Sequence, residues 1–203
     1  KFWFLDGTFL ITLIGHKKIV NGVSLSPDGE IIASASFDKT VKLWKLDGTP
    51  WKTLKRHTNK VYQVIFSPNG EMIASTGADR TLRIWNLEGK LLQTLRDHRK
   101  LIYQVSFSPD SKMIASTSSD KTIKLWNIDD GSLVRSIEEH SGRVWGVSFS
   151  PYGKMLASAS ADKTIKLWGT DPEDLILDLD VKLDNLLKKG CNWIRDYLKT
   201  NPN

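Results

Sequence analysis

The chain has 203 residues, of which 40% are hydrophobic and 26% charged, and its formal net charge is +6. This composition is ordinary for a soluble globular chain, and no run of residues approaches the ~18 consecutive apolar positions of a membrane-spanning helix. Cys191 is the single cysteine, which excludes a disulfide framework, and no signal-peptide pattern opens the sequence. We therefore expect a cytoplasmic protein that does not associate with a membrane.

Tryptophans recur along the chain at nearly constant intervals of 41, 41, 41 and 42 residues, at Trp3, Trp44, Trp85, Trp126 and Trp168. Histidines and aspartates keep the same step, as do a Ser-Pro turn and an Asp-Lys/Arg-Thr turn. Self-similarity at such a period is typical of repeat architectures.

Each repeat contains four short strand-like runs, which in the copy around Trp126 occupy residues 90–95, 101–107, 113–118 and 123–128. The run 101–107 is rich in β-branched and aromatic residues, and Pro109 after it cannot donate to a β-ladder, so it marks the end of a hairpin. Short strands at this spacing predict an all-β architecture. A four-stranded unit of this length has to stack on its copies, as a propeller blade does.

The second copy carries, in this order, His57, Val61-Tyr62-Gln63-Val64, Ser67-Pro68-Asn69-Gly70, Met72-Ile73-Ala74-Ser75, Asp79-Arg80-Thr81 and Ile84-Trp85. This run resembles a WD40 repeat, and the resemblance recurs four times between residue 1 and about residue 168. It departs from the family pattern in one respect, because the residue after each Trp is not Asp but Phe4, Lys45, Asn86, Asn127 or Gly169.

The resemblance implies WD40 β-propeller blades, with the full repeats at approximately 8–47, 48–88, 89–129 and 130–169. The last inner-blade strand of another repeat, at residues 1–5, precedes them. Since propellers close with about 4–8 blades and WD40 rings usually have more than four, we expect the C-terminal part of a larger ring. Self-association of two chains that complete one ring is the alternative.

A histidine, a serine, an aspartate and a tryptophan recur in each copy: His16, Ser34, Asp38 and Trp44; His57, Ser75, Asp79 and Trp85; His98, Ser116, Asp120 and Trp126; His140, Ser158, Asp162 and Trp168. The resemblance implies structural tetrads, in which the Asp accepts from the His, the His bonds the Ser, and the Ser meets the Trp indole. Catalytic Ser-His-Asp sets are the alternative, but acyl transfer needs an exposed nucleophile and an oxyanion hole. Histidines placed one per blade, with no cysteine partner, do not converge on a zinc ion. We therefore predict no enzyme activity, no metal and no cofactor.

Candidate partner-binding residues lie where the copies differ. The second residue of each predicted inner strand is Asn21, Tyr62, Tyr103 or Trp145, and Phe37 precedes the first tetrad aspartate. The resemblance implies that both positions lie at the rim of the central channel. Aromatic rings there are typical of recognition surfaces, so we predict that a protein or peptide binds them, with Lys60 and Arg143 nearby. The alternative is that the rings only pack between neighbouring inner strands.

Basic residues also recur, at Lys39, Arg80, Lys121 and Lys163 in the hairpin turns. A basic surface with aromatic rings makes nucleic acid or another polyanion the alternative partner. Solvated charges that protect the turns are the simpler interpretation.

The β-repeat pattern ends at Thr170. Leu179, Leu183 and Leu186 follow a helical spacing and Gly190 fits a helix end, so a helical C-terminal extension is predicted at residues 171–203. The segment Gly190-Cys191-Asn192-Trp193 resembles the tail of bacterial multidomain WD40 proteins, which implies an arm of a larger bacterial signalling protein. The helices either dock on the propeller or bind a partner.

Overall fold

The computed structural model describes residues 2–3 and 9–170, and the regular elements in this part of the chain are all β-strands. They are β1 (Phe2–Trp3), β2 (Phe9–Ile11), β3 (Val20–Leu25), β4 (Ile31–Ser36), β5 (Val41–Lys45), β6 (Pro50–Leu54), β7 (Val61–Phe66), β8 (Met72–Gly77), β9 (Leu82–Asn86), β10 (Leu91–Leu95), β11 (Ile102–Phe107), β12 (Met113–Ser118), β13 (Ile123–Asn127), β14 (Leu133–Ile137), β15 (Val144–Phe149), β16 (Met155–Ser160) and β17 (Ile165–Gly169). The predicted all-β fold is confirmed. The predicted helices, with Cys191, lie outside the described residues.

Strands that follow one another in the chain pair into four antiparallel sheets, the blades. They have the orders β3-β4-β5-β6, β7-β8-β9-β10, β11-β12-β13-β14 and β15-β16-β17, and β1 pairs with β2 in a separate sheet. Tight turns allow this meander. After β3, Pro27 fixes its own φ and Gly29 adopts a φ of +78°, which glycine does without steric cost.

Repeats and blades are out of phase by one strand. The strand β10 opens the third sequence repeat, yet it pairs with β9 and is the outermost strand of the second blade. Each repeat therefore contributes strands to two neighbouring blades, which joins the blades covalently as well as by packing.

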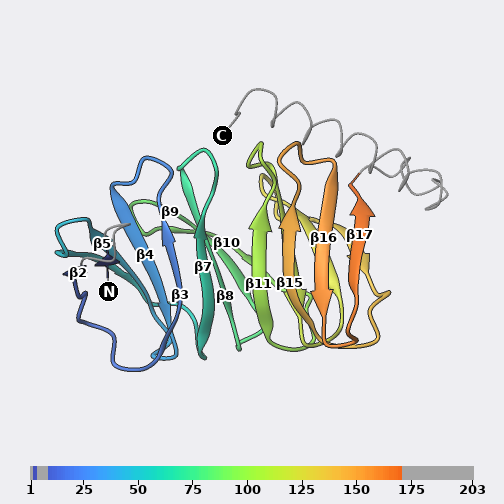
Figure 1. Cartoon of the computed structure of the whole chain (residues 1–203), viewed down its shortest axis with the longest axis horizontal. Coiled ribbons are helices and arrows are strands. Elements are labelled where there is room, and N and C mark those ends of the chain that lie inside the picture. Colours follow the sequence, from blue (N-terminus) through green and yellow to red (C-terminus); the bar gives the residue numbers. More distant parts are fainter. Residues whose placement is uncertain (1, 4–8, 171–203) are drawn as a thin grey trace, which may run out of the picture. The chain divides into compact units, whose positions relative to one another are not determined.

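The hydrophobic core lies between the blades. One cluster joins Val41 and Leu43 of β5 to Val61 and Val64 of β7, and an equivalent cluster joins the second blade to the third. The inner strands β3, β7, β11 and β15 lie side by side (Figure 1). Because each blade buries a face only against its neighbour, the blades stabilise one another. Within the described residues, no helix has the length and hydropathy that a membrane span requires.

Candidate functional site

A buried hydrogen-bond network joins the loop before each inner strand to the next strands of the same blade. In the second blade, His57 Nδ1 donates to Asp79 Oδ2 at 2.9 Å, because a carboxylate only accepts. The Ser75 hydroxyl then lies 2.9 Å from His57 Nε2, and Trp85 Nε1 donates to the same serine oxygen at 2.9 Å. The same bonds occur in the first set, His16, Ser34, Asp38 and Trp44, and in the third, His98, Ser116, Asp120 and Trp126. In the fourth set His140 bonds Asp162 and Ser158, and Trp168 lies on β17.

The carboxylate of each set accepts more hydrogen bonds than the four-residue pattern predicts. Asp79 also accepts from the backbone N–H of Thr58 at 3.0 Å and from the hydroxyl of Thr81 at 2.8 Å. Burial raises the pKa of Asp79, but the bonds from His57, Thr58 and Thr81 outweigh burial and hold the pKa well below its usual range. The turn threonines in the other blades, which sequence reasoning left out of the sets, are Thr40, Thr122 and Thr164.

These carboxyls make the stability of the blades depend on pH. In an unfolded chain an aspartate has a pKa of about 3.9, and in the folded protein the pKa is lowered for Asp38, Asp79, Asp120 and Asp162. Their contribution is therefore complete above the unfolded pKa and declines as pH falls below it, because the unfolded chain then takes up protons first. We expect urea midpoints to be level near neutral pH and to drop on acidification below about pH 4. The drop should be smaller in Asp79→Asn, and a midpoint that rises in acid would contradict this assignment.

The same geometry decides against a catalytic use of the serines. Ser75 is 0% exposed, and its oxygen lies between His57 and Trp85. An acyl-transfer nucleophile has to reach its substrate, which a serine enclosed in this way does not. Both ring nitrogens of His57 are also engaged, and among the described residues no three His, Cys, Asp or Glu side chains are grouped for a metal ion.

Aromatic rings from four successive blades form a continuous series, the aromatic row, which consists of Phe37, Tyr62, Tyr103 and Trp145. The ring centroids of Phe37 and Tyr62 are 5.4 Å apart, and those of Tyr62 and Tyr103 5.8 Å apart, both edge to face. Tyr103 and Trp145 are 4.3 Å apart and tilted. Aromatic pairs with such geometry attract one another. Trp145 is 47% exposed and the other three rings are partly buried, so the row packs on itself and still faces solvent.

A β-bulge at the start of the inner strands sets the position of three rings of the row, Tyr62, Tyr103 and Trp145. Val61 pairs with Gly77 and Gln63 with Thr76, which leaves Tyr62 as an extra residue in the ladder. Three residues hold the same extra position in the other inner strands: Asn21, Tyr103 and Trp145. Because a bulge turns a side chain out of the strand's regular alternation, the positions of these three rings are a consequence of this irregularity. The resemblance implied a rim position, but sequence reasoning did not foresee the bulge.

Two glutamines that sequence reasoning missed lie beside the row. Gln63 Oε1 accepts from the backbone N–H of Val105 at 2.7 Å, and Gln104 Oε1 accepts from that of Val147 at 3.2 Å, so each joins two neighbouring inner strands. A repeated Tyr-Gln pair was the available signal. The two glutamines line a hollow of about 400 Å³ together with Asn21 and three rings of the row, Tyr62, Tyr103 and Trp145.

Basic residues flank the same ends of the blades. Lys60 Nζ lies 4.9 Å from the centroid of the Phe37 ring, and Arg143 is exposed directly before β15. The turn residues all adopt a positive φ and are exposed: Lys39 (74°), Arg80 (64°), Lys121 (77°) and Lys163 (70°). The backbone N–H of Phe37 donates to the carbonyl of Ile19, which places these turns beside the starts of the inner strands.

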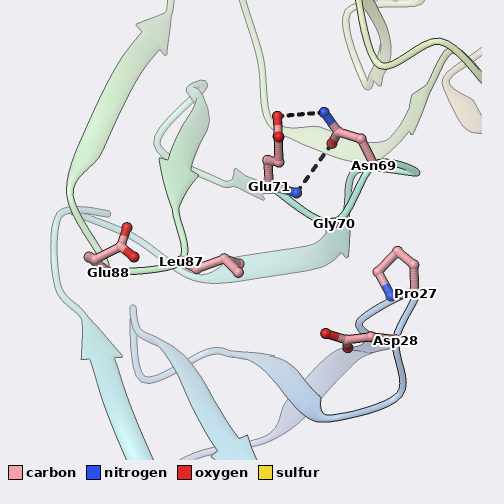
Figure 2. A pocket seen from close by; sticks show the side chains of 7 residues that line it. All are labelled: Pro27, Asp28, Asn69, Gly70, Glu71, Leu87 and Glu88. Atoms are coloured by element: carbon pink, nitrogen blue, oxygen red, sulfur yellow. Dashed lines mark hydrogen bonds between the residues drawn. The ribbon is translucent and has the colours of Figure 1, made fainter.

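A second hollow, of about 600 Å³, lies at the opposite ends of the inner strands. Its lining residues come from turns of the first and second blades: Pro27, Asp28, Asn69, Gly70, Glu71, Leu87 and Glu88 (Figure 2). Asn69 Nδ2 donates to Glu71 Oε2 at 2.8 Å, and the Glu71 N–H donates to Asn69 Oδ1 at 3.2 Å. This hollow is acidic, and sequence reasoning did not single it out.

Comparison with known proteins finds short, strong similarities. The chain is 64% identical over 31 residues to the Notchless protein homolog of Arabidopsis thaliana, which is 15% of this chain and 7% of that protein. It is 58% identical over 31 residues to Ribosome assembly protein 4 of Saccharomyces cerevisiae, which is 15% of this chain and 6% of that protein. The matched segment is thus a small part of each relative's length.

The family model for the WD domain, G-beta repeat, matches four segments of the chain, at residues 7–45, 48–86, 89–127 and 131–169. These matches cover well over half of the sequence and fall on the four blades and the strands that join them. This chain belongs to the WD40 repeat family.

Proposed function

We propose that the chain is a non-catalytic interaction module that binds a protein or peptide at the aromatic row. WD40 repeats generally serve as protein-interaction scaffolds, and the row supports one binding surface in particular. Its rings come from four blades, contact one another in sequence, and include Trp145 with 47% of its surface exposed. Pre-positioned aromatic rings contribute large contact areas at little entropic cost, as binding hot spots do.

The surroundings of the row favour the binding of an extended peptide segment that carries an acidic residue. The row runs across the inner strands, the hollow beside it offers amide groups from Gln63 and Gln104, and Lys60 and Arg143 are cationic. Apolar side chains of such a segment would contact the rings, while its carboxylate would pair with a basic residue. Selection of a phage-displayed random-peptide library on the chain tests this proposal. Enrichment of sequences with aromatic or aliphatic residues and Asp or Glu supports it, and failure to enrich any peptide argues against it.

A polyanion is the second candidate partner, because Lys39, Arg80, Lys121 and Lys163 are exposed at the same ends of the blades. Their positive φ values strain a non-glycine backbone, so replacing all four by Gly should cost little stability. If the chain binds heparin or duplex DNA, this variant should lose that binding, and the wild-type affinity should fall steeply as salt rises. Binding of a peptide at the row should survive both the four glycine substitutions and the higher salt concentration. Fluorescence anisotropy at two salt concentrations measures the affinity for the polyanion and for the peptide.

The wider setting of the module is also a proposal. The tail resemblance described above supports a cytoplasmic arm of a larger bacterial signalling protein, whereas the two similar proteins come from a plant and a yeast and give that setting no support. Their similarity is shorter than one repeat and supports the scaffold rather than a particular partner. The coding sequence upstream of Lys1 tests the setting: an in-frame signalling domain beyond further repeats supports it, and a chain without one argues against it.

A further inference from the structure

Arg83 is a buried arginine whose charge the second blade compensates only in part. Its side chain is 7% exposed and lies on β9, beside the outermost strand β10. Arg83 Nη1 donates to the hydroxyl of Thr94 at 3.3 Å, whereas Nη2 lies 3.8 Å from Asp79 Oδ2, beyond hydrogen-bond distance. Among the described residues, Arg83 Nε has no hydrogen-bond partner. Because Asp79 already accepts hydrogen bonds from three residues of its own network, it compensates Arg83 only at a distance.

The third blade surrounds the equivalent cation with acidic side chains. Lys124 stands at the repeat position of Arg83, and its Nζ donates to a carboxylate oxygen of Asp97, the residue before the tetrad histidine. Lys124 Nζ also donates to the hydroxyl of Ser136 at 3.2 Å, and this hydroxyl donates to Glu138 Oε1 at 3.4 Å. The positions of Asp97 and Glu138 in the repeat are therefore the places from which a side chain compensates this cation.

In the second blade both of these positions carry arginine. Arg56 precedes the tetrad histidine, as Asp97 does, and Arg96 directly follows β10, as Glu138 directly follows β14. Within the described part of the chain, neither arginine forms an ion pair with a carboxylate. Burial lowers the pKa of Arg83, the tetrad aspartate raises it, and the charges of Arg96 and Arg56 lower it again. The three guanidinium groups are thus close enough to act on one another.

We propose that a phosphate group binds between Arg56, Arg83 and Arg96, which we call the arginine site. The formal charges of the three arginines and of Asp79 leave two positive charges, and a phosphate monoester carries a charge of about −1.5 to −2 near neutral pH. Guanidinium groups donate from a planar fork that matches phosphate oxygens. Arg56 and Arg96 are exposed and approach the anion from solvent, while Arg83 lies at the base of the site. The site shares no residue with the aromatic row, so this proposal and the proposed function fail independently.

Isothermal titration calorimetry of the 203-residue chain with sodium phosphate, at an ionic strength held constant with sodium chloride, tests the proposal. A dissociation constant of about 1 mM or below is expected for an anion held by three guanidinium groups. A short peptide with one phosphoserine, and the same peptide without phosphate, form the second arm. Tighter binding of the phosphopeptide than of inorganic phosphate supports the site with a phosphorylated partner as the source. Equal or tighter binding of inorganic phosphate supports the site with free phosphate as the source.

Arg56→Asp gives Arg83 the acidic neighbour that Lys124 has in the third blade. The variant should bind phosphate at least tenfold more weakly, because a repulsive charge replaces an attractive one. Without phosphate it should melt no lower than wild type, since the new carboxylate compensates the buried cation. Lys154→Glu is the matched control with the same change in net charge. Lys154 is exposed directly after the Ser-Pro turn of the last blade, where two other repeats carry glutamate, so this variant should bind phosphate like wild type.

Arg96→Glu, which reproduces Glu138 of the third blade, provides a second variant and should also weaken phosphate binding at least tenfold. A chain that binds neither inorganic phosphate nor the phosphopeptide overturns the proposal. So do Arg56→Asp and Arg96→Glu variants that bind like wild type. Equal losses in Lys154→Glu and in the two arginine variants overturn it as well, because the anion would then respond to the net charge of the chain rather than to the arginine site.

Discussion

Asp79→Ala is expected to lower the free energy of unfolding by about 3 kcal/mol, the cost typical of removing one partner of a buried charged network. The substitution removes the acceptor of four groups at once: the ring of His57, the backbone N–H of Thr58, and both the hydroxyl and the backbone N–H of Thr81. His57 is only 7% exposed, so bulk solvent has little access to the ring nitrogen that loses its acceptor. Urea unfolding followed by circular dichroism measures the effect.

Single bonds of the same set should cost less. Trp85→Phe keeps most of the buried ring but removes the N–H that Ser75 accepts, and a loss of about 1–2 kcal/mol is expected. Because Ser75→Ala removes the other half of that bond, the double variant should be less destabilised than the sum of the single variants. Asp129→Ala, at an exposed turn, is the control and should stay within about 0.5 kcal/mol of wild type. A tetrad variant as mild as this control would show that the network contributes little.

The repeat pattern made the fold predictable. Because all copies share the same turns and strand lengths, a wrong strand assignment in one copy would have to be wrong in every copy. The repetition therefore makes the assignment of the strands more secure. The predicted run at 113–118 is β12, Met113–Ser118, and the run at 101–107 differs from β11, Ile102–Phe107, by its first residue. The period did not show where one blade ends and the next begins. The strand β10 opens a sequence repeat, yet it pairs with β9 and belongs to the preceding blade.

The candidate site was less accessible from the sequence, for physical reasons. A bulge at Tyr62 is a property of strand register, and neither alternation nor composition reports register directly. The role of Gln63 follows from its hydrogen bond to Val105, and this partner lies one repeat further along the chain, where no local sequence pattern reports the contact. The acidic hollow combines turns of two blades, so no contiguous motif marks it. The assignment of the aromatic row to partner binding stays a prediction.

Trp145→Ala is expected to weaken binding of a library-selected peptide at least tenfold while leaving the melting temperature nearly unchanged. A buried aromatic anchor in an interface commonly contributes about 2 kcal/mol or more, which exceeds that factor. The folded state depends much less on this ring, because Trp145 is 47% exposed and touches only Tyr103 among the rings of the row. Tyr152→Ala is the matched control, since this ring is 87% exposed and lies in the Ser-Pro turn at the other end of the blade.

Comparison with Tyr62→Ala separates binding from packing. Tyr62 contacts both Phe37 and Tyr103, so its truncation removes two ring pairs of the row and should lower stability by about 1–2 kcal/mol. If the row binds the partner, both variants lose the peptide although only Tyr62→Ala melts earlier. If the rings only pack between inner strands, Tyr62→Ala alone has a phenotype and Trp145→Ala binds like wild type. Loss of binding without loss of stability at Trp145 is therefore the result that a purely structural row does not produce.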